Sequence, residues 1–305
     1  MKEQSEEDRR VAMKLYQNAK IQMIAAMSVF GTIGIFVRYI PLPSSVIAFA
    51  RGLIGTLFLV LLLAVRRTPV SREEIRRNLK LLLLSGAALG FNWILLFESY
   101  RYTTVATTTL CYNMGPMFVI LASPLVREKL TARKILCVAV SLLGMGFVSG
   151  ALQNDLPAIG ELRGILLGLG AAVLYASVIL MNKLIRDISA YAKTIMQLGT
   201  AAVVIFPYIL LTENVTAMRP EPLAVVLLIF VGVVHTGINY AIYFNAMKDL
   251  KAQTSAILSY IDPVVAIVLS ALILKEALTL GNVLGAILIL GSALVSELPE
   301  KKKSA

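Results

Sequence analysis

Charged side chains are scarce in this sequence. Of its 305 residues 15% are charged and 58% are hydrophobic, whereas an average soluble domain carries about 25% charged residues. Histidine occurs once and cysteine twice. Cys111 and Cys137 lie apart within apolar runs, without the spacing of metal ligands, and we expect both to be small apolar fillers. The composition therefore argues against a soluble core and against a cysteine-based metal site.

Groups that carry catalysis are also missing. The sequence has no GxxxxGK[ST] phosphate loop and no paired carboxylates at active-site spacing. No polar segment between apolar runs exceeds about 16 residues, so a separate catalytic domain has no place in the chain. We expect a protein that is not an enzyme, is not driven by ATP and needs no metal or cofactor.

Long apolar runs take up most of the chain. Each has roughly twenty residues, the length that crosses about 30 Å of hydrocarbon as a helix. The first run is too long for a cleavable signal, so we expect it to be retained. The fold class predicted is an all-α integral membrane protein with ten transmembrane helices. The predicted spans are 21–40, 46–65, 79–99, 104–126, 134–150, 164–182, 190–211, 222–245, 254–273 and 281–297.

The excess of positive charge, +11 overall, follows this topology. Under the ten-span interpretation 23 basic residues fall on the side that holds both termini and 5 on the other side. Cytoplasmic loops carry such an excess, so both the N-terminal segment 1–20 and the basic tail 298–305 are predicted to be cytoplasmic. The charge is therefore not a footprint of nucleic acid, and the expected location is the cell (plasma) membrane.

The two halves of the chain are related by an offset of 147 residues. Gly90-Phe91-Asn92-Trp93 then aligns with Gly237-Ile238-Asn239-Tyr240, and Pro116 with Pro263. Identities at one constant offset indicate duplication. Because each unit, 21–150 and 164–297, holds five spans, the second must enter the membrane from the opposite side. Inverted repeats commonly place a substrate site near the midplane, where the repeats meet.

Family motifs occur in the same regions. Leu96-Phe97-Glu98-Ser99-Tyr100-Arg101, Asn113-Met114-Gly115-Pro116 and Arg127-Glu128-Lys129-Leu130-Thr131 resemble the EamA-type repeat of the drug/metabolite transporter superfamily, and Ser259-Tyr260-Ile261-Asp262-Pro263 is similar to the same signature. The resemblance implies a ten-helix bundle around a central cavity that works by alternating access, often on amino acids. It does not specify a substrate, and Gly115 stands where the second repeat has Asp262.

The function predicted is secondary active transport of small metabolites, as an exporter or exchanger, with amino acids or related compounds as the expected substrates. Export of cationic drug-like compounds or sugar derivatives is one alternative, and a passive facilitator or channel is another. The expected partners are a small-molecule substrate and the lipid bilayer, with protons as a candidate coupling ion. Homodimerisation stays open.

Candidate substrate-binding residues are polar or aromatic and lie within predicted spans. Asn92 and Asn239 occupy equivalent places in the repeats, and interhelical hydrogen bonding competes with cavity lining as their role. Aromatic side chains could supply apolar walls with polar tips, although each could equally be ordinary packing. These aromatic candidates are Trp93, Tyr112, Tyr175, Tyr240 and Tyr260.

Ionisable residues complete the predicted set. His235 and Asp262 each lie about 20 Å from the turn between their spans, close to the midplane, where one of them is predicted to change protonation as the carrier reorients. A buried hydrogen bond that only orders the bundle is the alternative. A second group, predicted at the outer rim, consists of Arg38, Arg51, Glu98 and Arg101, with a Glu98–Arg101 ion pair or recognition of a zwitterion as its role.

Overall fold

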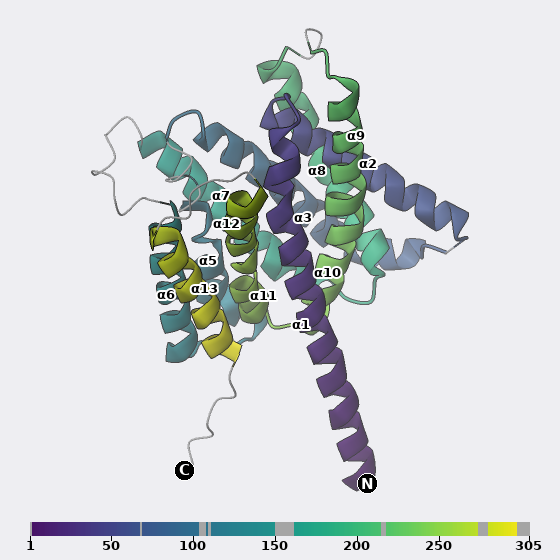
Figure 1. The fold of residues 1–305 in the computed structure, drawn as a ribbon. Helices are drawn as coiled ribbons and strands as arrows, with labels where there is room; N and C mark the ends of the chain where they lie inside the picture. Colours follow the sequence, from purple (N-terminus) through teal and green to yellow (C-terminus); the bar gives the residue numbers. More distant parts are fainter. Residues whose placement is uncertain are drawn as a thin grey trace.

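The computed structural model is a bundle of helices that covers residues 2–67, 69–103, 108, 111–149, 162–214, 218–273 and 280–297. Within these ranges the regular structure is helical, with no strand. Figure 1 shows the helices side by side and the start of the first helix projecting beyond the others. The all-α fold predicted from the apolar runs is confirmed.

The helices follow one another with short connections. Their bounds are α1 Lys2–Arg38, α2 Ser44–Val65, α3 Arg72–Ser99, α5 Gly115–Ala122, η1 Ser123–Val126, α6 Ala132–Ser149, α7 Leu162–Leu184, α8 Ala190–Thr212, α9 Pro222–Phe230, η4 Val231–Ile238, α10 Asn239–Asp249, α11 Ala252–Leu258, α12 Ile261–Ile273 and α13 Leu280–Glu297. η1 is a 3-10 helix and η4 is a π-helix. α9, η4 and α10 are continuous, and so are α5 and η1.

Seven helical segments within the described ranges are long and apolar enough to cross a membrane. They are Gln17–Arg38, Ser44–Val65, Arg72–Ser99, Leu162–Leu184, Ala190–Thr212, Pro222–Asp249 and Ala252–Ile273. Large apolar side chains lie on their outer faces, and Leu211 is 86% exposed. Water would oppose so large an apolar surface, whereas lipid does not. The chain is therefore a multi-pass membrane protein.

The described residues of every predicted span are helical apart from short breaks. α1 already begins at Lys2, so the helix runs back through the segment 1–20 that was predicted only to precede the first span. Parts of the predicted span 104–126 and the whole tail 298–305 lie outside the described residues. The prediction for the tail therefore stays a prediction.

Two breaks interrupt predicted spans near their middles. Turns at residues 113–114 and 259–260 precede α5 and α12. Pro116 and Pro263 lie in the first turns of these helices, where the missing N–H of proline costs no helical hydrogen bond. The two prolines therefore begin new helices instead of kinking continuous ones.

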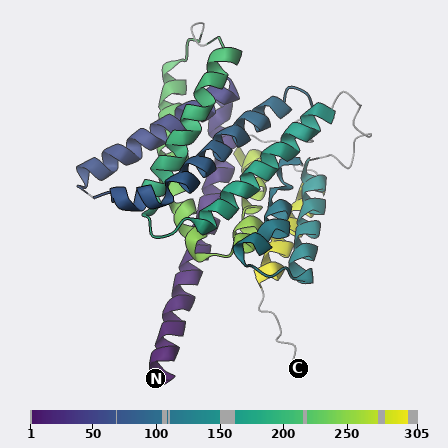
Figure 2. The ribbon, with the colours of Figure 1, turned by 180° about the vertical axis from the view of Figure 1, so that it is seen from behind.

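Helices from the two halves of the chain alternate in the bundle. α3 lies against α7 and α8, while α10 lies against α1 and η4 lies against α2. α5 contacts α7, α12 contacts α1, and α6 runs along α13. Figures 1 and 2 show this interleaving from opposite sides. Residues distant in sequence consequently meet along the centre of the bundle.

Glycine allows the closest helix contacts. A Cβ atom placed on Gly55 of α2 would lie 2.9 Å from the carbonyl oxygen of Gly232 and 2.9 Å from the nitrogen of Gly237, both in η4. A Cβ on Gly86 of α3 would lie 2.8 Å from the carbonyl oxygen of Gln197 in α8. Small residues at helix crossings let backbones approach in lipid, where apolar side chains gain little by associating. Glycine at these crossings therefore sets the spacing of α2, α3 and their partners.

Candidate functional site

A cavity of about 430 Å³ lies inside the bundle, among α1, α2, α3, α7, α10 and α12. Its walls are mainly aromatic and aliphatic. The aromatic lining residues are Phe30, Trp93, Phe97, Tyr100, Tyr112, Tyr175, Tyr240, Tyr243 and Phe244. An enclosed apolar space with a few placed polar groups is the usual form of a small-molecule site.

The described lining residues include one basic side chain, Arg51, and one carboxylic acid, Asp262. The two groups are close enough to interact electrostatically. No ion pair joins them, however, in the part of the chain that the structure describes. The cavity therefore presents a positive and a negative group that do not neutralise each other by direct contact.

Arg51, which we predicted at the outer rim, lines the cavity wall. Its guanidinium carbon lies 4.6 Å from the centre of the Trp93 ring, a cation–π contact. Its buried Nε has no hydrogen-bond acceptor. Arg51 is seven residues into α2, which corresponds to a depth of about 10 Å. Span boundaries inferred from hydropathy are too coarse to give such a depth in advance.

Asp262 lies in the first turn of α12, directly after the break at residues 259–260. The N-terminus of a helix favours a negative charge, because its free N–H groups point outward. Three phenols are within electrostatic reach of the carboxylate, those of Tyr112, Tyr175 and Tyr240. The only acid of the described cavity wall thus has three phenols within electrostatic reach.

The aromatic candidates Trp93, Tyr112, Tyr175 and Tyr240 are brought together by the fold. The ring centres of Tyr112 and Tyr175 lie 5.6 Å apart, and those of Trp93 and Tyr240 lie 6.3 Å apart. The sequence analysis missed Tyr243, whose hydroxyl lies 3.2 Å from the Tyr175 hydroxyl. Tyr243 follows Tyr240 by three residues, and side chains at this spacing share one face of a helix. This spacing from Tyr240 could have identified Tyr243 as a cavity residue from the sequence.

Asn92 and Asn239 hold helices together. Asn92 Nδ2 donates to the carbonyl oxygen of Ala171 on α7 at 2.6 Å, and Asn239 Nδ2 donates to that of Ala26 on α1 at 3.0 Å. Both side chains are buried and lie outside the described lining of the cavity. The geometry corresponds to interhelical hydrogen bonding, the first of the two roles weighed from the sequence, although the Asn92 amide also contacts the Tyr112 hydroxyl.

His235 and Tyr260 also lie outside the described cavity lining. The hydroxyl of Thr32 forms a hydrogen bond with His235 Nε2 at 2.7 Å and also lies 2.8 Å from the carbonyl oxygen of Val29. This arrangement leaves His235 Nδ1 buried without a partner. Tyr260 is fully buried and donates to the carbonyl oxygen of Asn113 at 2.9 Å. The hydrogen bond of His235 links η4 to α1, and the hydrogen bond of Tyr260 holds the backbone at Asn113, which lines the cavity.

Charged groups gather where α3 ends. Arg101 pairs with Glu98 at 3.1 Å and with Glu213 at 3.7 Å. Tyr208 donates to Glu98, and Ser45 donates to Glu213 at 2.7 Å. The predicted Glu98–Arg101 ion pair is therefore present, within a network that links α3, α8 and α2. Arg38 is exposed at the end of α1.

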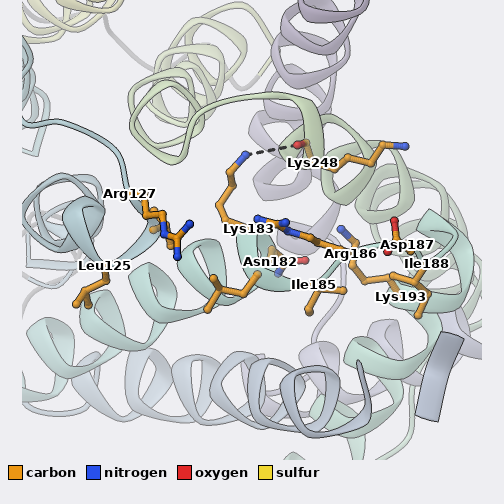
Figure 3. A pocket seen from close by; sticks show the side chains of 12 residues that line it. Leu125, Arg127, Asn182, Lys183, Ile185, Arg186, Asp187, Ile188, Lys193 and Lys248 are labelled. Carbon is orange, nitrogen blue, oxygen red and sulfur yellow. Dashed lines mark hydrogen bonds between the residues drawn. The ribbon is translucent and has the colours of Figure 1, made fainter. Parts of the chain in front are cut away.

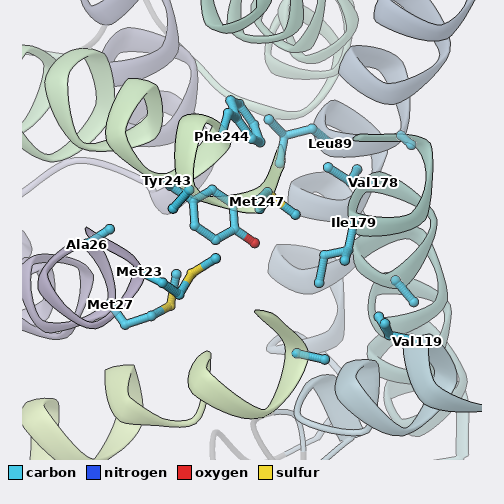
Figure 4. Packing of buried hydrophobic residues seen from close by; sticks show 14 of the residues in the cluster. Met23, Ala26, Met27, Leu89, Val119, Val178, Ile179, Tyr243, Phe244 and Met247 are labelled. Carbon is cyan, nitrogen blue, oxygen red and sulfur yellow. The ribbon is translucent and has the colours of Figure 1, made fainter. Parts of the chain in front are cut away.

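The main apolar cluster of the bundle adjoins the cavity and shares Met27 and Tyr243 with its lining. Met23 and Met27 of α1 point toward Tyr243 of α10, as Figure 4 shows. Met247 and Ile179 belong to the same cluster and are fully buried. The cavity also reaches Tyr100, which follows the last residue of α3. Its lining thus extends from methionine and aromatic side chains of this cluster to the end of α3, where the charged network lies.

Comparison with known proteins identifies a family for this chain. Residues 18–150 and 162–297 each match the EamA-like transporter family. An uncharacterized transporter of Bacillus subtilis strain 168, YxxF, is 30% identical over 287 residues, which cover 93% of this chain and 91% of the relative. An uncharacterized transporter of Archaeoglobus fulgidus is 27% identical and covers 92% of this chain and 96% of its own.

A solved crystal structure has the same fold. It superposes with a TM-score of 0.82 over 92% of this chain and 98% of its own, at 17% identity. So low an identity supports the fold alone. With both halves matched and with transporters among the full-length relatives, this chain belongs to the EamA-like transporter family of membrane proteins.

Proposed function

We propose that this protein is a secondary active transporter, an exporter or exchanger, whose substrates are amino acids or related zwitterions held between Arg51 and Asp262. An amino acid carries a carboxylate and an ammonium group a few ångströms apart. Arg51 offers unused N–H donors to the carboxylate, and Asp262 offers its oxygens to the ammonium. The absence of a described ion pair between these two residues is the observation that carries the proposal.

The cavity disfavours the alternative substrates. A cationic drug-like compound would meet Arg51 at close range, and like charges in a site of low polarity repel strongly. A neutral sugar derivative would leave both charges without a partner, which is costly for buried groups. A volume of about 430 Å³ with aromatic walls suits one small metabolite with an apolar side chain.

Ten spans in two inverted repeats, 21–150 and 164–297, form the topology that we propose. This topology is supported by equivalent helices of the two halves, which make equivalent contacts with the other half. α3 lies against α7 and α8, and the corresponding helices α10 and η4 lie against α1 and α2. The amide of Asn92 bonds to α7, and the amide of the equivalent Asn239 bonds to α1. A pseudo-two-fold axis would pass through the cavity between these pairs.

In alternating access, the end of the cavity that is closed would open, and the other end would close. We take the apolar cluster around Met23 and Met247, which adjoins the cavity, as the closed end of this arrangement. Separation of α1 from α10 would open that end, while closure around Tyr100 would seal the other. The breaks before α5 and α12 supply short segments that can move without unravelling whole spans.

Asp262 is the proposed coupling group for protons. It is the carboxylic acid of the described cavity wall, so it meets both substrate and, when the cavity is open, water. His235 is a weaker candidate because its ring lies outside the described lining, between Phe36 and Phe230. A proton that leaves Asp262 in one orientation and returns in the other would couple transport to the pH gradient.

Counterflow in proteoliposomes tests this proposal. Purified protein is reconstituted with unlabelled amino acids inside, and the uptake of labelled amino acids is measured with and without a pH gradient. Arg51→Gln should reduce uptake by about tenfold or more, since a hydrogen bond between charged groups contributes about 1.5–3 kcal/mol. Asp262→Asn should lose the response to the pH gradient, while exchange stays detectable at a lower rate because the contact of the carboxylate with the ammonium is weakened.

Arg163→Gln is the matched control. Arg163 also makes a cation–π contact, 4.2 Å from the centre of the Tyr102 ring, but it is exposed and lies outside the described cavity lining. Uptake by this variant should equal that of the wild type. If Arg51→Gln transports amino acids as well as Arg163→Gln does, the zwitterion site is wrong. If the wild type ignores the pH gradient, proton coupling is wrong and an exchanger or facilitator remains.

A further inference from the structure

A second pocket lies at the end of the bundle where α7 and α10 end and α8 begins (Figure 3). Its volume is about 830 Å³. Five basic side chains from four parts of the chain line it, and we name this pocket the basic groove: Arg127, Lys183, Arg186, Lys193 and Lys248. None of them takes part in the aromatic cavity described above.

Acidic side chains do little to neutralise the basic groove. Asp187 is the acid among the described lining residues, and it pairs with Arg77 of α3 at 3.4 Å. Glu128 accepts hydrogen bonds from the backbone N–H groups of Ala252 and Gln253 at the start of α11. Asp249 lies within electrostatic reach of the groove lysines. Counting all three acids, positive charge remains in excess.

Two of the lysines are fixed on backbone oxygens of α10. Lys193 donates to the carbonyl oxygen of Phe244 at 2.9 Å. Lys183 donates to those of Met247 at 3.3 Å and of Lys248 at 3.4 Å, and also to that of Leu250 directly after α10. Lys193 is only 3% exposed. Its ammonium group has three donors, and the described residues supply one acceptor. Donor capacity is therefore left over inside the groove.

Hydrogen bonds fix the backbone of the two groove arginines, Arg186 and Arg127. Asn78 of α3, itself buried, donates to the carbonyl oxygen of Arg186 at 2.9 Å and accepts from the Arg186 N–H at 3.4 Å. Arg127 ends η1 in the left-handed conformation, φ 62°, with its N–H bonded to Pro124. The backbone that carries both arginines is therefore fixed, while their side chains are exposed and accessible to a ligand.

We propose that the basic groove is a binding site for a phosphate group, either on a soluble phosphorylated compound or on the headgroup of an anionic phospholipid. Several cations around one space favour an anion of more than one charge, and arginine forks match phosphate oxygens. The groove lies at the ends of the spans, the depth at which headgroup phosphates lie. The site does not depend on the substrate proposed for the cavity.

Binding of phosphate in the groove would also affect the cavity through α10. Lys183 and Lys193 hold the last turns of α10, and the earlier turns of α10 carry Tyr240 and Tyr243 into the cavity wall. An anion that draws these lysines away from the carbonyl oxygens would loosen the end of α10. Occupancy of the groove would therefore alter transport without contacting the substrate.

The test compares variants for two phosphate sources. In detergent, inorganic pyrophosphate is titrated against the thermal unfolding of the full chain, with sodium chloride at equal ionic strength as reference. In a second arm, native mass spectrometry counts phosphatidylglycerol retained from mixed bilayers of phosphatidylcholine and phosphatidylglycerol. The groove variant combines Arg127→Gln and Arg186→Gln. The control combines Arg66→Gln and Arg76→Gln, exposed basic residues outside the described groove lining.

If the ligand is a soluble phosphorylated compound, pyrophosphate should stabilise the wild type and the control equally. The pyrophosphate concentration that gives half of the stabilisation should rise about tenfold for each arginine removed from the groove. A lipid ligand predicts instead that the groove variant loses bound phosphatidylglycerol. Equal behaviour of groove and control variants in both arms overturns the proposal. Should the double variant fail to fold, Lys248→Gln replaces it, because that side chain is exposed and lines the same groove.

Discussion

Two glycines on α2, Gly52 and Gly55, should respond in opposite directions to replacement by alanine. Both are buried and lie three residues apart on the same helix. A Cβ at Gly52 would meet its nearest atom, on the Trp93 ring, at 3.7 Å, which is ordinary van der Waals contact. A Cβ at Gly55 would lie 2.9 Å from backbone atoms of Gly232 and Gly237, which cannot rotate away.

The size of the effect follows from these distances. Alanine gains about 0.8–1.0 kcal/mol over glycine in a helix, at either position. At Gly55 the added carbon is about 0.5 Å too close, and overpacking of this kind costs typically 1–3 kcal/mol. Gly52→Ala should therefore stabilise the protein by somewhat less than about 1 kcal/mol, and Gly55→Ala should destabilise it by up to about 2 kcal/mol.

Thermal unfolding of the purified variants measures the difference. The helix propensity is common to both, so the gap between them reports the crowding at Gly55 alone. At about 2–4 °C per kcal/mol, Gly55→Ala should unfold at least 2 °C below Gly52→Ala. Equal shifts of the two variants would contradict the close crossing of α2 and η4. A Gly55→Ser variant, crowded in the same way, should behave like Gly55→Ala.

Two further predictions concern the helix pairings and the orientation. Asn92→Ala and Asn239→Ala should each lower stability by about 0.6–1.7 kcal/mol, the range for interhelical hydrogen bonds in lipid, and unfolding by heat should show similar losses for both. A much larger loss of transport than of stability would instead favour a role in the cavity. Cysteines at Arg72 and Glu221, in a chain without its native cysteines, should differ in labelling by a membrane-impermeant reagent, with only Glu221 reacting in intact cells. Labelling at Arg72 would reverse the proposed orientation.

Much of the fold could be predicted because membrane helices have a strong hydropathy signal. Apolar runs of the right length marked the helices, whereas the breaks before Pro116 and Pro263 were not predicted. Hydropathy does not show how each helix is rotated about its axis, and so which of its side chains face the cavity. It also could not show that α1 begins at Lys2, because a polar helix that projects beyond the bundle has no apolar face to reveal it.

Prediction of the site depended on helix rotation and was therefore less complete. Tyr112 and Tyr175 line the cavity, whereas Tyr260 lies outside its described lining, although all three are aromatic residues of predicted spans. Arg51 was assigned to the rim because a charge near the end of a span usually faces water. The Trp93 ring beneath its guanidinium and the cavity beside it stabilise the charge at greater depth, and neither is visible in the local sequence.

Trp93 is the only tryptophan in the chain, and it lies in the cavity wall beneath Arg51. The ultraviolet emission of the unlabelled protein at wavelengths where tyrosine is silent therefore originates from one ring. A charged or polar molecule that enters the cavity changes the polarity around that ring, and a displaced guanidinium changes its quenching. The protein consequently carries an intrinsic optical probe of cavity occupancy, which can report binding in detergent or lipid before any substrate has been labelled.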